Sequence, residues 1–120
     1  MRNFDHSLEE CPGAIIPIVG AKYRTTAAKE MYKTMPVGTK ISLVLDPDNE
    51  YDSTAVKVYA RRCHIGYVPQ ELSNSIYGNV LLERVRACYV VQECNPRGIN
   101  GAKFVMFIEP PTQKQEDDNN

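Results

Sequence analysis

Short apolar or alternating runs, separated by turn-forming residues, are the feature that most restricts how this chain can fold. They lie at residues 15–19, 39–45, 55–59, 62–68, 84–91 and 103–108. Runs of this kind, bounded by Gly, Pro and Asn, predict β-strands. The tight connection between 55–59 and 62–68 predicts a hairpin. Pro17 cannot donate to a ladder, so the first run is expected at a sheet edge or a bulge.

Two segments show helical spacing instead. Thr25 or Thr26 can cap a helix that ends before Pro36, and a second helix begins at Pro69, a favoured first helical position. The apolar side chains on one face are Ala28, Met31, Tyr32 and Met35 in the first helix, and Leu72 and Ile76 in the second. About six strands with two short helices, and no βαβ alternation, predict a mainly β domain. It should be a small barrel or sandwich with helical caps.

The chain is expected to form one domain, because 120 residues support one modest core. We expect a flexible N-terminal segment at 1–12, a folded domain at 13–111 and a disordered acidic tail at 112–120. The net charge of −1 is unevenly distributed, since the folded body carries +3 and each end carries −2. A mildly basic body permits a short nucleic-acid contact. The net charge of −1 argues against a protein that holds long duplex DNA by charge alone.

No segment predicts a membrane span, an export signal or a bound metal. No apolar run approaches the roughly 20 residues that a bilayer requires, and the first residues lack a secretory signal, so the expected location is the cytoplasm. The four cysteines form no Cys-x-x-Cys pair, so we expect reduced thiols rather than a zinc site. Residues 46–52 have the acids of a calcium loop, but Tyr51 and Lys57 occupy the positions that need Gly and Glu. We therefore expect neither a metal nor another cofactor.

The sequence also lacks the common catalytic motifs. It contains no Gly-x-Ser-x-Gly elbow, no Walker A loop and no Gly-x-Gly-x-x-Gly. Two-metal nuclease chemistry needs convergent carboxylates, whereas the acids of 46–52 lie on one loop without a clear partner elsewhere. We predict a binding module that is not an enzyme.

Three segments carry a more specific pattern. They read Val-Gly-x-x-Tyr at 19–23, Asp-Pro-x-Asn-x-Tyr-Asp-x-x-Ala-Val-x-Val at 46–58, and Ile-Gly-Tyr-Val-Pro-x-Glu-Leu at 65–72. This order resembles the HIRAN domain, which occurs in fork-remodelling helicase-like proteins and as small stand-alone proteins of bacteria and phages. The resemblance covers about residues 14–110. It implies an OB-like β-barrel with two helices and, as in the best-understood members, a pocket for the 3′ end of single-stranded DNA.

The resemblance, carried over by position, assigns eight residues to the DNA site: Lys22, Tyr23, Asp48, Asn49, Tyr51, Asp52, Tyr67 and Gln70. Their chemistry agrees with this assignment. An ionised carboxylate such as Asp52 is a good acceptor for a free 3′-OH, which internal nucleotides lack. Tyr23 and Tyr51 can stack on unpaired bases, and Lys22 can neutralise a phosphate.

Some of these positions depart from the family pattern. Lys22 replaces an arginine and loses its bidentate phosphate contact, and Asp48 replaces an asparagine and adds negative charge. Tyr67 and Gln70 stand where a DNA-binding relative has histidine and lysine. Structural roles also stay open: Asp52 as an acceptor for loop N–H groups, Tyr23 packed on the barrel rim, Lys22 as a solvated charge, and Tyr67 with Val68 in the core. Arg61 and Arg62 are more typical of a charged hairpin tip than of a binding patch.

The leading hypothesis is a non-catalytic module that recognises single-stranded DNA at 3′-OH ends, in DNA repair, at replication forks or in DNA processing. The alternative is a protein-interaction module, of phage or host, that occludes a partner protein without binding DNA. The acidic tail and the altered loop would suit this second role. A nuclease ranks last because the carboxylate geometry is lacking.

Overall fold

In the computed structural model, residues 13–95 and 100–109 are described. The elements in chain order are β1 (Gly13–Pro17), the 3₁₀ helix η1 (Ala21–Tyr23), α2 (Thr26–Thr34), β2 (Ser42–Asp46), β3 (Ala55–Ala60), β4 (Cys63–Tyr67), α3 (Gln70–Leu81), β5 (Val85–Gln92) and β6 (Lys103–Ile108). The predicted mainly β domain with six strands and two α-helices is confirmed. The expected flexible segment 1–12 and tail 112–120 lie outside the described residues.

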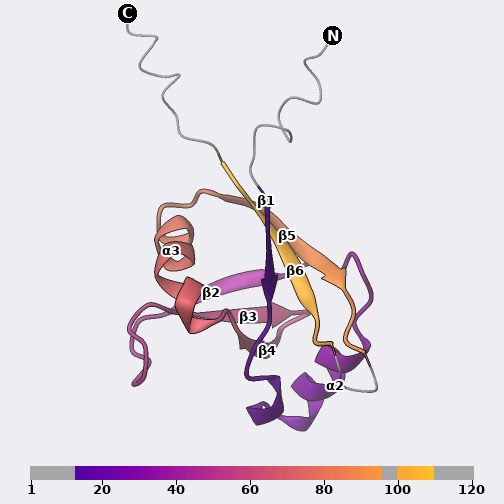
Figure 1. The fold of residues 1–120 in the computed structure, drawn as a ribbon. Coiled ribbons are helices and arrows are strands. Elements are labelled where there is room, and N and C mark those ends of the chain that lie inside the picture. The colour runs from indigo at the N-terminus through magenta and orange to yellow at the C-terminus, as the bar shows by residue number, and fades with distance from the viewer. Residues whose placement is uncertain (1–12, 96–99, 110–120) are drawn as a thin grey trace, which may run out of the picture.

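The strands form two antiparallel sheets of three strands each, with orders β1-β6-β5 and β2-β3-β4. The two sheets cross steeply, as Figure 1 shows. Pro17 lies opposite Lys103 on the edge strand β1, as its missing N–H predicted. The predicted hairpin is β3–β4, whose two-residue turn consists of Arg61 and Arg62.

The core lies between the two sheets. Its largest fully buried apolar side chains are Phe104, Ile16, Met35, Ile65, Val56, Val58 and Val90. They come from both sheets and from the C-terminal end of α2, so each sheet buries one face. The other face of the β2-β3-β4 sheet stays accessible along part of its length, because Val44 on β2 is 42% exposed.

The two sheets are joined at two corners. At one corner Val19 and Tyr67 exchange backbone hydrogen bonds of 2.9 and 2.8 Å. At the other, the N–H of Ile41 donates to the carbonyl of Cys88 over 3.0 Å. These two connections give the arrangement the OB-like form that was expected.

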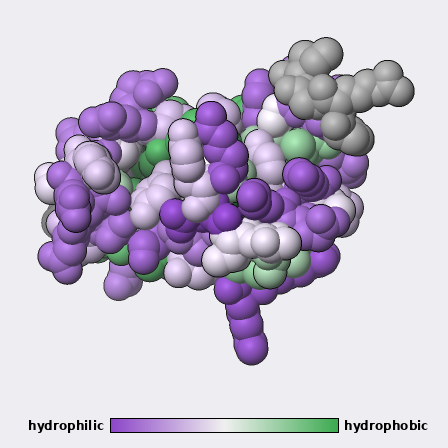
Figure 2. Space-filling view, turned by 90° about the horizontal axis from the view of Figure 1, so that it is seen from below, coloured by the Kyte–Doolittle hydropathy of each residue, from purple (hydrophilic) through white to green (hydrophobic). Residues whose placement is uncertain are grey.

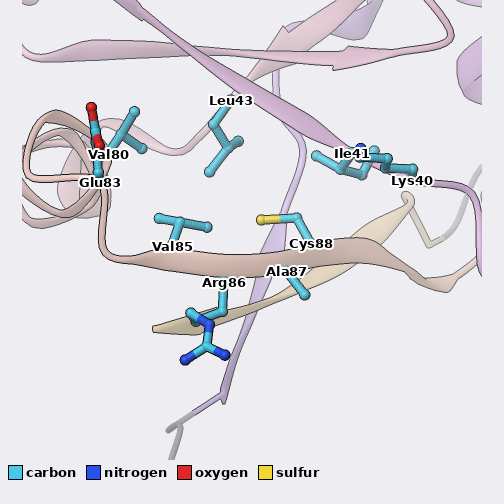
Figure 3. A pocket seen from close by; sticks show the side chains of 9 residues that line it. All are labelled: Lys40, Ile41, Leu43, Val80, Glu83, Val85, Arg86, Ala87 and Cys88. Atoms are coloured by element: carbon cyan, nitrogen blue, oxygen red, sulfur yellow. The ribbon is translucent and has the colours of Figure 1, made fainter. Parts of the chain in front are cut away.

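The predicted barrel is not fully closed. In the part of the chain that the structure describes, no ladder joins β2 to β5. A groove of about 360 Å³ lies between them instead. In Figure 3, Leu43 from β2 and Val80 from α3 point toward Val85 and Cys88 on β5. The barrel is therefore open on this side, where side chains from β2, α3 and β5 line the groove.

The two helices begin and end as local chemistry dictates. Thr25 caps α2 by accepting the N–H of Ala28 at 3.1 Å, and α2 ends before Pro36. The hydroxyl of Tyr32 accepts the N–H of Ala102 at 3.0 Å, which fixes α2 to the start of β6. Pro69 serves as the N-cap of α3 rather than its first residue.

Hydrophilic side chains cover most of the face seen from below, where apolar atoms show only in small separate patches (Figure 2). In the described ranges 13–95 and 100–109, no helix has the length and apolar character needed to cross a membrane. Cys63, Cys88 and Cys94 are free thiols, as expected. Burial raises the pKa of the Cys88 thiol to about 12, so this cysteine is unreactive.

Candidate nucleic-acid interface

A pocket of about 240 Å³ opens where the β2–β3 loop meets the end of β4 and the start of α3. The residues that line it are Val19, Asn49, Tyr51, Asp52, Ala55, Tyr67, Val68 and Gln70. Five of the eight residues assigned from the sequence are among them: Asn49, Tyr51, Asp52, Tyr67 and Gln70. Two corners of the fold that are distant in sequence thus form one cavity.

Asn49 organises the β2–β3 loop. Its side-chain Oδ1 accepts the backbone N–H of Tyr51 at 2.9 Å and that of Asp52 at 3.0 Å. Its Nδ2 donates to Oδ2 of Asp46 at 3.1 Å. Asparagine side chains stabilise turns in this way. Because the loop is held by its backbone, the ring of Tyr51 remains free and 88% exposed at the pocket.

Asp52 connects this loop to α3. Its Oδ1 accepts the N–H and the hydroxyl of Thr54, both at 2.9 Å, and its Oδ2 accepts the hydroxyl of Ser73 at 2.7 Å. The Ser73 bond, followed by the Thr54 bonds, lowers the pKa of Asp52, so the carboxylate is ionised at neutral pH. A carboxylate offers about four acceptor positions, so Asp52 can accept one further donor. Asp52 therefore has the structural role that the sequence left open, as an acceptor for loop N–H groups. It can still accept a donor from a ligand.

Tyr67 forms one wall of the pocket. Its backbone pairs with Val19, and its hydroxyl donates to Oδ2 of Asp46 at 3.1 Å. Desolvation, followed by the nearby Asp46, raises the pKa of the phenol, so it stays neutral. Val68 beside it is buried, with 3% exposed. The expected core position thus applies fully to Val68 and only partly to Tyr67, which is half-buried.

Gln70 brings the N-terminus of α3 to the pocket. It is the first residue of the helix and is exposed. The cap residue Pro69 makes no side-chain hydrogen bond to the helix. The first N–H groups of a helix lack intrahelical acceptors and favour anions. This end of the pocket can therefore receive a phosphate.

Three of the assigned residues do not line the pocket. Lys22 and Tyr23 lie on η1, which begins two positions beyond the pocket residue Val19, and the Nζ of Lys22 is 5.2 Å from the ring centroid of Tyr23. Tyr23 is 72% exposed, so the idea that it packs on the barrel rim is wrong. Asp48 is exposed on the β2–β3 loop. These three residues are therefore neighbours of pocket residues in the sequence rather than part of the pocket lining.

The loop beside the pocket is acidic. Four carboxylates lie between positions 46 and 52, on Asp46, Asp48, Glu50 and Asp52. The hydrogen bond from Asn49, together with that from Tyr67, lowers the pKa of Asp46. Within the ranges 13–95 and 100–109, no three His, Cys, Asp or Glu side chains gather in a way that could hold a metal ion. The loop is thus suited to accept hydroxyl and amine donors rather than to bind phosphates.

Comparison with known proteins decides the family. The model of the HIRAN domain matches residues 14–97, which is most of the chain. This chain belongs to the HIRAN domain family. HIRAN domains are DNA-binding modules, so the pocket lies on a DNA-binding fold.

One solved structure shows the same fold. The crystal structure of the HIRAN domain of human HLTF superposes with a TM-score of 0.62, covering 89% of this chain and 84% of that chain. The two sequences are 16% identical over this alignment, so the likeness concerns the fold. The sequence has no significant match among curated proteins.

Sequence reasoning missed the apolar lining of the HIRAN pocket. Val19, Ala55 and Val68 line it, but an apolar residue carries no chemical signal that separates a pocket wall from the core. Ser73 was missed as well, although its hydroxyl is 2% exposed and binds Asp52. A polar residue on the buried face of α3 was the available signal, because buried hydroxyls need a partner.

Proposed function

We propose that this HIRAN domain is a non-catalytic module that binds the 3′-OH end of single-stranded DNA in the pocket beside Asp52. The proposal assigns it to the targeting of DNA ends during repair, at replication forks or in DNA processing. The observation that carries it is the state of the Asp52 carboxylate. It is ionised, it is fixed by Thr54 and Ser73, and it retains one acceptor position at the pocket.

The terminal hydroxyl is the group that this carboxylate can distinguish. A hydroxyl can donate a charge-assisted hydrogen bond to Asp52. A 3′-phosphate has no such donor and carries negative charge toward an acidic loop. An internal nucleotide has neither a free 3′-OH nor room to end in the cavity. Recognition of the 3′-OH end therefore depends on two properties of the terminal group, namely its hydrogen-bond donor and its lack of negative charge.

The other pocket groups support binding of the last nucleotides. The exposed ring of Tyr51 can stack on a base, which contributes about 1–3 kcal/mol in single-strand binders. Tyr23 offers a second exposed ring on η1. The uncapped start of α3 at Gln70 can bind the last phosphate through backbone N–H groups. None of these contacts depends on base identity.

The test is fluorescence anisotropy with matched single strands that end in 3′-OH or 3′-phosphate. The loss of one hydrogen bond to a charged group lowers affinity roughly 10- to 100-fold, so the 3′-OH strand should bind better by about that factor. Asp52→Asn should abolish this preference. Glu50→Gln is the matched control, because it removes the same charge from an exposed residue of the same loop that does not line the pocket.

Equal affinity for the two ends in the unchanged protein contradicts end recognition. Loss of the preference in both the Asp52 and the Glu50 variant shows a general charge effect, which also contradicts it. If no strand binds at low salt, the protein-interaction module becomes the better explanation. In that case pull-down experiments with the unchanged protein would replace the DNA titration.

A further inference from the structure

The outer face of the β2-β3-β4 sheet leads away from the end pocket. Lys57 and Tyr59 alternate onto this face of β3, and the register pairs Lys57 with Tyr67 and Tyr59 with His64 across a β-bulge. Tyr67 also forms the pocket wall. The face therefore starts at the pocket and extends, with cationic and aromatic side chains, toward the β3–β4 turn.

The aromatic side chains form a continuous row on this face. The ring of Tyr67 contacts His64 edge-on with centroids 4.9 Å apart, and His64 stacks on Tyr59 with centroids 5.3 Å apart and planes at 20°. All three side chains are half-buried, so each keeps an accessible part. Arg24 covers part of this row, because its guanidinium lies 5.8 Å from the ring centroid of Tyr67 and donates to Nδ1 of His64. The accessible parts of the rings can contact unstacked bases.

The row ends at a turn with an unusual sequence. Arg61 and Arg62 form the two-residue β3–β4 turn, with φ of 49° and 72°. A turn with both residues in this left-handed region strongly favours Asn-Gly, because Cβ of other residues comes too close to the following carbonyl oxygen. Two arginines at these positions oppose the local preference of the turn. A role for their charge explains their presence.

The two arginines share a hollow with Lys40. This hollow of about 590 Å³ is lined by Gly38, Thr39, Lys40, Ser42, Arg61 and Arg62. Among the described residues, no carboxylate forms an ion pair with Lys40, Arg61 or Arg62. Three cations without counter-charges thus gather at the end of the sheet opposite the acidic loop.

We propose that this basic hollow binds phosphates of the same DNA strand whose 3′ end occupies the pocket, on the 5′ side of that end. The bases between the two sites would lie on Tyr59 and His64, with Lys57 beside them. The inference rests on the proposed function. It also explains how a protein with an acidic end pocket attracts a polyanion, because the phosphate-binding charge lies elsewhere on the sheet.

The distance between the two sites sets the length of strand required. β3 runs from the pocket residue Ala55 to Ala60, next to the turn, and spans roughly 20 Å at the usual strand rise. In Figure 1 it extends from the β2–β3 loop to the opposite end of its sheet. A dinucleotide is too short to reach from the pocket to the hollow. A strand of about ten nucleotides, within the range that OB folds occupy, can reach both sites.

The experiment compares a fluorescent thymidine dinucleotide with an oligothymidine of about ten nucleotides, both ending in 3′-OH. The key variant is Arg61→Asn/Arg62→Gly, which keeps the turn and removes two charges. The control is Lys29→Gln/Lys33→Gln, which removes two charges from α2. The unchanged protein should bind the longer strand about tenfold better, and only the turn variant should lose this gain. Its affinity for the short strand should not change.

The salt dependence gives an independent readout. Each phosphate contact of a single strand adds about 0.7 to the slope of log affinity against log salt. The slope for the longer strand should fall by about 1.4 in the turn variant, and the slope for the short strand should stay constant. Equal affinity of the unchanged protein for both strand lengths, or equal loss in both double variants, overturns the inference alone. If the short strand fails to bind the unchanged protein, the end pocket itself is wrong and the inference falls with it.

Discussion

The hydroxyl of Ser73 donates to Oδ2 of Asp52 over 2.7 Å, and this bond joins the buried face of α3 to the β2–β3 loop. Ser73 is 2% exposed, although serine is usually found at the surface. Its hydroxyl also lies 3.1 Å from that of Thr54, which bonds the same carboxylate. The carboxylate proposed to read the DNA end is thus positioned by a helix that follows it by about twenty residues in the sequence.

Ser73→Ala should both destabilise the protein and weaken end recognition. Removal of a buried hydroxyl with its hydrogen bond costs about 1 kcal/mol of the free energy of unfolding. Urea denaturation measures this loss, and anisotropy should show a smaller preference for 3′-OH over 3′-phosphate. Ser75→Ala, at an exposed position of the same helix, is the control and should change neither quantity. An unchanged end preference in a stably folded Ser73→Ala protein would remove Ser73 from the site.

Gly66→Ala should damage the corner that forms the pocket wall. A Cβ at this position would lie 2.5 Å from the backbone oxygen of Val19 and 2.7 Å from Cγ2 of Ile18. The Val19–Tyr67 pairing must then shift, at a cost of roughly 1–3 kcal/mol. At Gly78 in α3 a Cβ meets nothing within 4 Å, so Gly78→Ala should stabilise the helix by about 0.5–1 kcal/mol. The Tm of Gly66→Ala should therefore be lower, and that of Gly78→Ala higher, than the Tm of the unchanged protein.

His64 should be neutral at physiological pH. The guanidinium of Arg24 can only donate, so its 2.8 Å bond makes Nδ1 of His64 an acceptor, and Nε2–H donates to the carbonyl of Gly66 at 2.9 Å. Desolvation and the charge of Arg24 lower the pKa of His64, with smaller opposing effects from Gly66 and Asp46 and a lowering one from Lys57. NMR titration in a His6→Ala background, which leaves one histidine, should give a pKa below 6.5.

The same shift predicts how stability depends on pH. The unfolded chain takes up the proton at the ordinary histidine pKa, and the folded chain takes it up only at lower pH. The contribution of neutral His64 to the free energy of unfolding should therefore be fully present above about pH 6.5. It should decrease as the pH falls through the lower pKa of folded His64. A pKa at or above 6.5 would show that the Arg24–His64 bond does not form in solution.

The strained β3–β4 turn gives a stability prediction of its own. Arg61 and Arg62 both adopt positive φ, which costs of order 1 kcal/mol for each residue without a compensating interaction. Arg61→Asn/Arg62→Gly should therefore raise the free energy of unfolding by about 1 kcal/mol or more, as urea denaturation can measure. A variant that is more stable yet binds the longer strand less well would demonstrate strain retained for binding. A less stable variant would show that the arginines hold the turn.

Local chain chemistry was sufficient to predict most elements of the fold. Pro17 marked an edge strand because it lacks an N–H, and Thr25 marked the start of α2 because its hydroxyl can cap a helix. The tight connection between β3 and β4 predicted the hairpin. Each of these signals involves residues that are neighbours in the sequence. The loop residues Asn49 and Asp52 were likewise visible, because turn-forming side chains bond to backbone groups a few positions away.

Contacts between distant parts of the chain were decided only by tertiary structure. Val19 meets Tyr67, and Ser73 meets Asp52, because the two sheets cross and α3 returns over the loop. β2 and β5 remain apart, and side chains such as Leu43 and Cys88 line the groove between them. Such pairings depend on how all the buried faces pack together, and no local pattern encodes that. For the same reason the sequence marked Arg61 and Arg62 only as a charged tip, whereas packing placed them beside Lys40, at the end of a row of rings that starts at the pocket.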